Sequence, residues 1–324
     1  MNISVIIASH NTRKYIRKCL DSILNQTMKD LEIIIVDDAS IDDTSKTIME
    51  LGQQYSNIVF HQLEESHGPG NARNIALSMA QGKYIAFVDS DDWIDLNYLQ
   101  IMYDKANETN ADIIACGLIR EYDYPSKDPV YKCRYDQEYV LSGEIAFRIM
   151  TGEYNYGINY ISSSLNKLYN RQFLQKNSLK FAENIYFEDQ PFSYACTLAA
   201  KKIICVPGVL YHHYKRTGSI VQSFDVKNID DMMTAYKIIK EYLNNHHIYE
   251  QYRFNFYSSL QHFYNLIIRQ IFEFVVSEDE KKQYIKYSFA KIKEIIDINE
   301  YLDYVTAEEL RRHIQPEIDV TTIY

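Results

Sequence analysis

Paired cysteines are missing from this sequence. It has five cysteines and no C-x-x-C pair. An odd number of cysteines without that spacing favours neither a disulfide framework nor a thiolate zinc site. We expect all five to be reduced and buried; they are Cys19, Cys116, Cys133, Cys196 and Cys205.

Long apolar runs are missing as well. No uninterrupted apolar stretch approaches the ~18 residues that a membrane-spanning helix needs. The first apolar segment, residues 2–8, is short and has no basic leader of the kind that precedes a secretory signal core. These features predict a cytoplasmic protein, at most in peripheral contact with the inner face of the membrane.

An excess of positive charge is the third absence. The chain has 34 Lys and Arg against 44 Asp and Glu, a net charge of -10. Such a surface works against binding a polyanion by counterion release, so nucleic acid is not expected as a partner. A nucleotide-sized anion is still compatible with this charge, because one pocket needs only a few local donors or a metal ion.

What is present fits a globular chain of 324 residues with 46% hydrophobic residues. Residues 1 to about 120 alternate short apolar runs with helical periodicity, which is typical of a parallel sheet with crossover helices. We expect an apolar helix face from Tyr15 to Leu24, and Gly82 as the C-cap of a helix over 72–80. The strands are expected at residues 4–8, 32–36, 58–62, 84–88 and 112–116. Such a sheet binds ligands beyond the carboxyl ends of its strands.

The rest of the chain divides near residue 225. Residues 121–157 lack a clear period and are expected to be a loop that faces the acceptor, with a short helix near 143–150. Residues 158–224 return to short elements, and residues 225–324 show long helical patterns. We therefore expect 1–120 and 121–224 to be two halves of one domain, followed by a helical domain. The tyrosines of the last hundred residues are expected to be core or subunit contacts.

The strongest chemical signal is the apolar strand Tyr84–Val88, which runs directly into three carboxylates. If the strand continues, Asp89 and Asp91 point the same way and suit one hard divalent cation, completed by phosphate and water. The alternative is a solvated acidic turn that caps the next helix, a role for which Asp92 and Asp95 are the candidates.

Two other segments sit where the expected sheet would bind a ligand. Asp38 follows the second strand, where its carboxylate can accept a hydrogen bond from a base or a ribose. Residues 68–74 open a helix with glycines that allow a ligand to approach, at a helix end that favours anions. Arg73 in the first turn opposes the helix dipole, which suggests a ligand or a carboxylate partner.

The ordered motifs SVIIASHN, EIIIVDDAS, GPGNARN and YIAFVDSDDW resemble the family 2 glycosyltransferases of the GT-A fold, over residues 1 to about 120. The resemblance implies a mostly parallel α/β sheet with helices on both faces, a nucleotide-sugar donor, and Mn²⁺ or Mg²⁺ held by Asp91. Ala8 stands where some relatives carry a polar residue near the base. The residues implied to line the donor site are Ala8, His10, Asn11, Asp38, Gly68, Asn71, Arg73, Asp89 and Ser90.

Two further segments, Asn166–Asn170 and Tyr186–Gln190, resemble the second half of polysaccharide-type members. An acceptor hydroxyl has a high pKa, so its attack on a sugar benefits from a carboxylate that takes the proton. In the family the second acid of the pair is this base, which implies Asp189 here, with Glu188 orienting it or holding an acceptor hydroxyl. Taken without the resemblance, a Glu-Asp pair more often begins a helix.

The segment 210–220 resembles the family's Tyr-rich, basic segment that returns to the diphosphate. A histidine here would complete the metal shell, while Arg216 and Ser219 would reach the phosphates. On a strand His212 and His213 face opposite ways, so at most one is a ligand. We favour His212; the alternative is two ordinary histidines on a half-exposed strand.

The expected activity is inverting transfer of a sugar, with a UDP-sugar as donor and a cell-surface glycan, a lipid-linked sugar or a protein-linked sugar as acceptor. The helical domain is expected to serve dimerisation, acceptor docking or membrane-surface contact. One alternative is a metal-dependent phosphohydrolase, which fits poorly because Trp93 stands where that class wants Thr or Val. The other is a non-catalytic nucleotide-sugar binding module.

Overall fold

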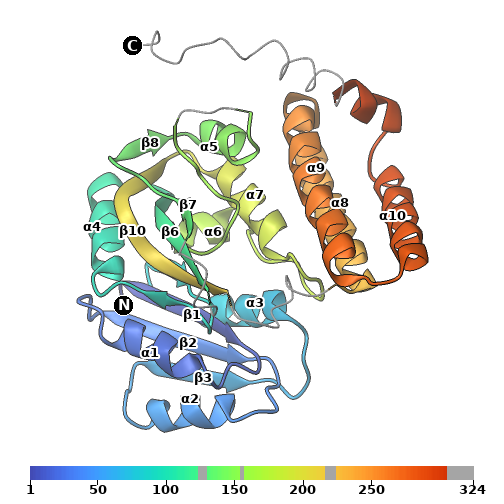
Figure 1. The fold of residues 1–324 in the computed structure, drawn as a ribbon. Helices are drawn as coiled ribbons and strands as arrows, with labels where there is room; N and C mark the ends of the chain where they lie inside the picture. The colour runs from blue at the N-terminus through green and yellow to red at the C-terminus, as the bar shows by residue number, and fades with distance from the viewer. Residues whose placement is uncertain (123–129, 154–156, 216–223, 305–324) are drawn as a thin grey trace. The chain divides into compact units, whose positions relative to one another are not determined.

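The structure is a computed structural model that describes residues 1–122, 130–153, 157–215 and 224–304. The chain forms two compact units, Met1–Gln222 and Ser223–Tyr324. The first is an α/β unit and the second is helical (Figure 1). All five cysteines are free and buried, as expected.

The α/β unit is built on one sheet with the strand order β3-β2-β1-β4-β9-β6-β10-β5, where β7 also pairs with β6 and β8 with β10. The strands are β1 Ile3–Ser9, β2 Leu31–Asp37, β3 Ile58–Gln62, β4 Tyr84–Phe87, β5 Trp93–Ile94, β6 Ile113–Tyr122, β7 Val130–Cys133, β8 Tyr139–Leu141, β9 Lys167–Asn170 and β10 Ile203–Lys215.

The sheet is mixed rather than mostly parallel. Strands β1 to β4 pair in parallel, as do β6 and β10. Strand β9 lies antiparallel between β4 and β6, and β5, β7 and β8 are antiparallel additions. Two successive reversals give β6 and β10 the direction of β4. The carboxyl ends of β1, β2, β4, β6 and β10 therefore share one edge of the sheet.

Helices cover both faces of this sheet. Helix α1 connects β1 to β2 and helix α2 connects β2 to β3, so both connections move in the same direction along the sheet. Helix α3 connects β3 to β4, which lies on the other side of β1, so this connection runs in the opposite direction. Because such crossovers are right-handed, α3 packs on the opposite face, against β1 and β2. The helices of this unit are α1 Ile16–Leu24, α2 Thr44–Gly52, α3 Pro69–Met79, α4 Tyr98–Thr109, α5 Gly143–Met150, α6 Arg171–Lys176 and α7 Asp189–Ala199.

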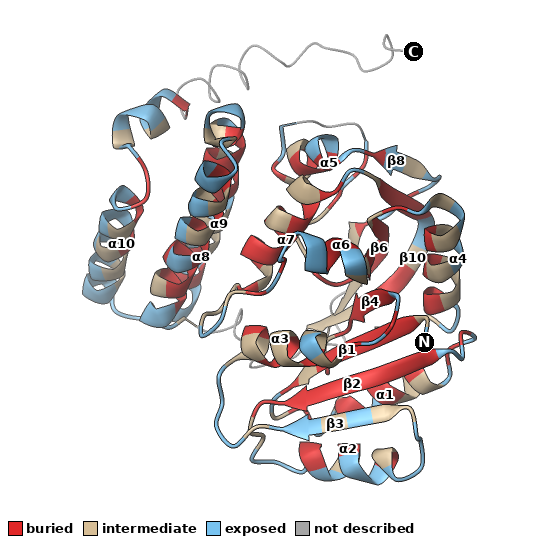
Figure 2. Ribbon diagram, turned by 180° about the vertical axis from the view of Figure 1, so that it is seen from behind, coloured by how far each residue is buried: buried red, intermediate tan, exposed pale blue. Residues whose placement is uncertain are grey.

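The core follows the continuous apolar runs of the sequence. Strands β1, β2 and β4 are buried almost throughout, while β3 at the edge of the sheet is largely exposed (Figure 2). Central parallel strands are covered on both faces, which is why they read as unbroken runs of Ile and Val.

Two expectations from the sequence are wrong. Helix α3 ends at a C-cap formed by Ala80, not Gly82. Gly82 instead lies against β1, where a Cβ would be 2.4 Å from the Ser4 backbone nitrogen. Residues 121–157 are also more than a loop with a helix, because they contain β7 and β8. These strands are short and partly exposed, so they carry no apolar run that sequence reasoning could use.

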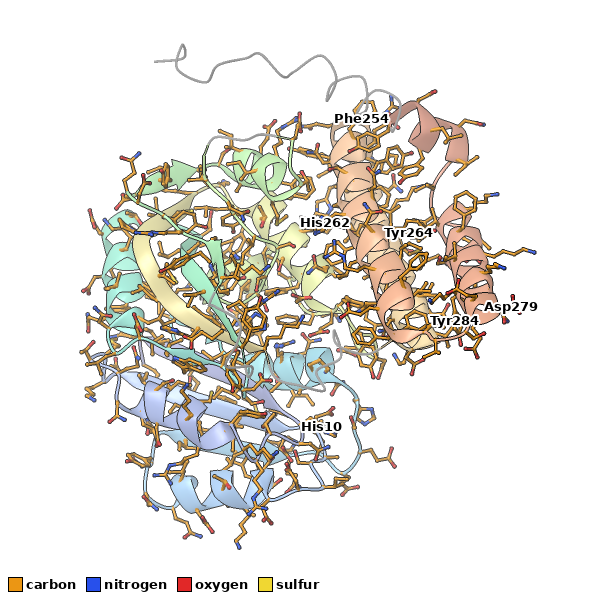
Figure 3. The ribbon with its side chains drawn as sticks, in the orientation of Figure 1. His10, Phe254, His262, Tyr264, Asp279 and Tyr284 are labelled. Atoms are coloured by element: carbon orange, nitrogen blue, oxygen red, sulfur yellow. The ribbon has the colours of Figure 1, made fainter. Side chains whose placement is uncertain are left out.

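The described part of the helical unit contains α8 Val226–Asn245, α9 Tyr249–Phe274 and α10 Glu278–Lys293, and residues 298–304 are helical as well. Its core is aromatic, as expected from the tyrosine content: Tyr236 and Tyr257 are buried, and Tyr236 lies edge-on to Phe256 at 5.7 Å. Figure 3 marks Phe254 on α9, which is exposed. Within the described residues, no helix is long and apolar enough to cross a membrane.

Candidate active site

The ends of β1 and β2 are joined by a buried carboxylate that sequence reasoning missed. Asp37 accepts hydrogen bonds from Ser9 Oγ at 2.8 Å, from Ser40 N at 3.0 Å and from Ser45 Oγ at 2.7 Å. Asn11 is tied to the same turn, since its backbone nitrogen donates to Ser40 Oγ at 2.8 Å. The signal available in the sequence was the pair of serines, Ser40 and Ser45, that follow Asp37.

Asp38 faces the loop that leads into α3. Its carboxylate accepts from Ser66 Oγ at 2.7 Å, His67 N at 2.8 Å and Gly68 N at 2.9 Å. Its role toward a base or ribose stays a prediction. His10, marked in Figure 3, is exposed, and its Nδ1 lies 2.6 Å from the Asp38 carbonyl oxygen.

A buried arginine joins the two halves of the unit. Arg73 is 7% exposed and places its guanidinium 5.2 Å from the Phe181 ring. Its Nη2 donates to Asp89 Oδ1 at 2.7 Å, and its Nη1 donates to Glu188. Arg73 therefore has two carboxylate partners, one that follows β4 and one that precedes α7. Gly70 permits this packing, because a Cβ there would meet the carbonyl oxygen of residue 182 at 2.0 Å.

Asp189 is the first residue of α7, directly beside this cluster. Burial raises the pKa of Asp189 to about 7, and the negative charge of Glu188 adds to the effect while Arg73 opposes it. A carboxyl group with this pKa is half ionised near neutral pH and can accept a proton. Phe187 precedes the pair with φ 63, a conformation that is unusual for an aromatic residue and turns the chain sharply before α7.

The acidic segment after β4 is a turn, not a continued strand. Strand β4 ends at Phe87, and Asp92 N donates to the Asp89 carbonyl at 3.0 Å. The premise that Asp89 and Asp91 alternate along one strand is therefore wrong. Asp91 is partly buried, and Ser90 between the two is buried.

Asp92 and Asp95 do not cap the following helix, whose N-cap is Asn97. Asp92 is buried and accepts from Tyr211 Oη at 2.8 Å and from Tyr214 N at 2.7 Å. Burial, reinforced by the charges of neighbouring acids, raises the pKa of Asp92 well above its usual value. This acid ties the turn after β4 to β10.

His212 is held by carboxylates through both ring nitrogens. Its Nδ1 lies 2.6 Å from Glu121 Oε1 and its Nε2 lies 2.9 Å from Asp95 Oδ1, while its ring stacks on Trp93 at 5.3 Å. Neither nitrogen is left for a metal in this arrangement, which argues against the expected ligand. The preference for His212 rested on a near-even choice that spacing alone did not decide.

His213 lies on the other face of β10. Burial lowers the pKa of His213 to about 4, helped by Arg120, while the charge of Asp89 acts in the opposite direction. Its imidazole is therefore neutral at pH 7. Arg216 and Ser219 lie outside the described residues. Within the described ranges, no group of three or more His, Cys, Asp or Glu residues could hold a metal ion by itself.

The structure places predicted site residues in two contacting groups, which are His10, Asn11, Asp38 and Gly68 in one and Arg73, Asp89 and Glu188 in the other. Asp38, Asp89 and Arg73 lie at the carboxyl edge of the sheet or at the start of α3, and Glu188 joins them from a segment far along the chain. Ala8 is partly buried near the end of β1. Asn71 is partly buried in the first turn of α3.

Comparison with known proteins agrees with this arrangement. The profile described as Glycosyl transferase family 2 matches residues 4–177. A putative glycosyltransferase EpsH of Bacillus subtilis is 31% identical over 261 residues, covering 78% of this chain and 72% of that protein. The poly(ribitol-phosphate) beta-N-acetylglucosaminyltransferase TarS of Staphylococcus aureus is 28% identical over 268 residues, which are 76% of this chain and 44% of TarS.

Among solved structures, that of S. aureus TarS 1-349 in complex with UDP-GlcNAc aligns with a TM-score of 0.61 and 22% identity, over 99% of this chain and 94% of the other. At this identity the likeness shows the fold alone, and it confirms the expected α/β architecture followed by helices. The family profile, the EpsH alignment and the ordered motifs together show that the chain belongs to glycosyl transferase family 2.

Proposed function

We propose that this protein transfers a sugar, with inversion, from a UDP-linked donor to a hydroxyl of a cell-surface glycan or of a lipid- or protein-linked sugar. The observation that carries the proposal is the Arg73 bridge between Asp89 and Glu188, with the pKa of Asp189 at about 7 directly beside it. The names of the relatives support a glycosyltransferase: EpsH is named a putative glycosyltransferase, and TarS is named for transfer of N-acetylglucosamine to poly(ribitol-phosphate).

The reaction needs one group that takes the proton of the acceptor hydroxyl, and Asp189 fits that need. Asp89 and Glu188 are committed to Arg73, and Asp38 is committed to the loop before α3. Oxygens of both carboxylates are occupied by hydrogen bonds from the guanidinium. Asp189 has a raised pKa instead, so it can accept the proton as the new bond forms. Attack from the acceptor side then displaces the nucleotide in line and inverts the anomeric carbon.

The donor side belongs to the ends of β1, β2 and β4. The backbone nitrogens at the start of α3 are the donors that a nucleotide diphosphate would meet there. His10 would line this pocket with its ring, because its Nδ1 faces the Asp38 carbonyl oxygen and its Nε2 faces the Asn11 amide nitrogen. Asp38 keeps the loop before α3 in place through three hydrogen bonds. We assign Asp38 two roles in the nucleotide pocket: it holds this loop in place, and its carboxylate accepts a hydrogen bond from the base or the ribose.

A divalent cation fits this site through Asp91. No cluster of three acidic or soft ligands exists in the described part of the chain, and Mg²⁺ or Mn²⁺ bound with a nucleotide commonly uses one or two protein ligands plus phosphates. When bound, the cation supplies charge that offsets the leaving diphosphate. We assign Asp91 to the cation and prefer His213 to His212 as a second ligand, because the His213 ring is neutral at pH 7 while both His212 nitrogens face carboxylates.

The helical unit has a different task in this proposal. Residues 225–324 serve dimerisation, acceptor docking or contact with the inner face of the membrane, in a cytoplasmic protein. A folded fragment ending at residue 224 should therefore still bind UDP, as measured by calorimetry. A folded fragment that has lost UDP binding would contradict this division.

Release of UDP from a panel of UDP-sugars, measured with and without manganese, tests the function itself. Release that requires both a specific UDP-sugar and an acceptor glycan supports transfer. Phosphate release from simple phosphomonoesters would favour the phosphohydrolase alternative. Tight binding of UDP-sugars without turnover under any condition would favour a binding module.

A further inference from the structure

A short backbone segment beside the start of α7 is held by its carbonyl groups. Lys167 Nζ donates to the carbonyl oxygens of Ile161 at 3.1 Å and Ser163 at 2.7 Å. Gln190 Nε2 donates to the carbonyl oxygen of Ser162, between them, at 3.3 Å. Three successive carbonyls are thus fixed by two side chains, one from β9 and one from α7.

Lys167 is unusual because it is a lysine with only 2% exposure. Its ammonium group also lies 4.8 Å from the centre of the Tyr160 ring. Burial lowers the pKa of Lys167 to about 8, so the protonated form still predominates at pH 7 and can donate to both carbonyls. Buried ammonium groups are tolerated where such acceptors replace water. Lys167 therefore orders residues 161–163.

Gln190 makes a second contact through the same amide nitrogen. Its Nε2 lies 3.4 Å from Asp189 Oδ1, and the side chain is 6% exposed. A side-chain amide has two N–H groups, so it can donate to Ser162 and Asp189 together. Because both partners are acceptors, the nitrogen and not the oxygen must face them.

We propose that Gln190 is a positioning residue for the carboxylate of Asp189, and that Lys167 holds the backbone segment against which Gln190 is fixed. This inference rests on the proposed role of Asp189 as the base. A base needs one orientation toward the acceptor hydroxyl, because a misplacement of about 1 Å can lower a rate about 100-fold. The chain from Lys167 through residues 161–163 to Gln190 supplies that constraint from outside α7.

The charges that face Asp189 are those of Glu188, Arg73 and Asp89. The two acids raise the pKa of Asp189, and Arg73 lowers it. Gln190 also lowers the pKa of Asp189, through its hydrogen bond, but carries no charge. Replacing Gln190 with leucine should therefore raise the pKa of Asp189 without altering the net charge of the site.

The dependence of stability on pH measures this without any substrate. Asp189 has a higher pKa in the folded protein, at about 7, than the ~3.9 of an unfolded chain, so ionisation opposes folding. The wild type should lose stability relative to Asp189→Asn as pH rises through this window, and the difference should level off above the folded pKa. The difference in stability between Gln190→Leu and Gln190→Leu/Asp189→Asn should also fall with pH. It should level off at a pH about half a unit or more above the wild-type value.

Thermal unfolding of these four proteins between pH 5 and 9 provides the readout. Curves that level off at the same pH in both backgrounds would overturn the role of Gln190. If Gln190→Leu does not fold, Gln190→Asn, whose amide is one methylene shorter, gives the same comparison. Lys167→Met should shift the plateau in the same direction by a smaller amount, and an unchanged plateau would remove Lys167 from the inference.

Gln26 offers a matched control. It is also a buried glutamine, and its Nε2 donates to the carbonyls of Ser22 at 2.9 Å and Asp95 at 2.7 Å. Gln26→Leu should lower stability but leave the plateau where it is in the wild type. A separate assay of UDP release tests the role of Asp189 as the base independently of its contact with Gln190. Full transfer activity in Asp189→Asn would refute the proposed base, whereas the plateau shift tests the contact itself.

Discussion

The α/β unit and the helical unit place their charges in opposite ways. In the α/β unit an arginine and a glutamate with 7% and 6% exposure form an ion pair, and Lys167 and Asp92 are buried as well. In the described part of the helical unit most ion pairs join residues three or four positions apart on one helix, such as Lys282 and Asp279, and Asp231 is the only charged side chain buried there. Burying charge opposes folding unless it is paired, so its concentration in one unit indicates selection for something other than stability.

The aromatic residues differ less between the two units. Phe181 and Phe192 of the α/β unit stack at 4.0 Å, and the Phe181 ring centre lies 5.2 Å from the Arg73 guanidinium. In the helical unit Tyr236, Phe256 and Tyr257 pack into the core between helices. Aromatic rings thus build the core of both units, and in the α/β unit one of them also contacts the buried Arg73. We expect variants of the buried charges in the first unit to change activity or stability, and variants of the exposed ion pairs in the second to change neither.

The largest effect on activity should come from Asp91. Asp91→Asn removes the carboxylate assigned to the cation, so manganese-dependent release of UDP should fall to the level seen without metal. Metal titrations of UDP release from UDP-GlcNAc, for wild type and variant, are the measurement. A variant that keeps wild-type activity and manganese dependence would show that Asp91 is not the metal ligand.

Asp189→Asn should lower the rate of transfer by ~10² to 10⁴-fold, the usual contribution of a positioned base. Donor affinity should barely change, because the base contacts the acceptor. The wild-type rate should also decline as pH falls below about 7, where Asp189 becomes protonated, and the variant should lose this limb.

Calorimetry and steady-state kinetics on the same Asp189→Asn sample are decisive. Asp279→Asn, an exposed change on α10 marked in Figure 3, is the control that should leave both quantities intact. Weakened donor binding with near-normal turnover would move Asp189 into the donor pocket.

Arg73→Met should destabilise the α/β unit by about 3–5 kcal/mol, because it leaves Glu188 buried and Asp89 partly buried without their partner. Chemical denaturation at pH 7 measures the free energy of unfolding. The loss should be smaller at pH 4, where protonation of the two acids relieves the unpaired charge. A loss that is independent of pH would mean that packing against Phe181 is the main contribution.

Lys282→Ala is expected to have the smallest effect. The Lys282–Asp279 pair spans 3.7 Å with both side chains highly exposed, and water screens such a pair. Denaturation should detect no change in the free energy of unfolding. A clear loss would break the contrast between the units and would point to a role for this face of α10.

Much of the first unit is readable from the sequence because its signals are local. The apolar runs at residues 4–8 and 32–36 predict β1 and β2 within about one residue at each end, and the short helix expected near 143–150 is α5. Central parallel strands are buried on both faces, so their sequences are continuous apolar runs that are easy to recognise. The short strands β7 and β8 carry no such pattern and were missed.

The site was only partly readable. The placement of Arg73 near the start of α3 predicted a ligand or a carboxylate partner, and the structure supplies two carboxylates. Nothing in the spacing showed that Asp37 would accept a hydrogen bond from Ser9 at the end of β1, or that both nitrogens of His212 would face carboxylates. Those facts depend on residues about 28 or more positions away, and spacing carries no information at that range.

The sequence by itself determined the family, the α/β architecture with helices after it, and the order of the acidic motifs. It did so because family motifs, apolar periodicity and strand-end carboxylates are properties of neighbouring residues. Only the tertiary structure decided that β9 would run antiparallel between β4 and β6, and that Arg73, Asp89 and Glu188 would form one buried cluster. The pKa of Asp189 belongs to this second class, because burial and the charges around it exist only once the chain has folded.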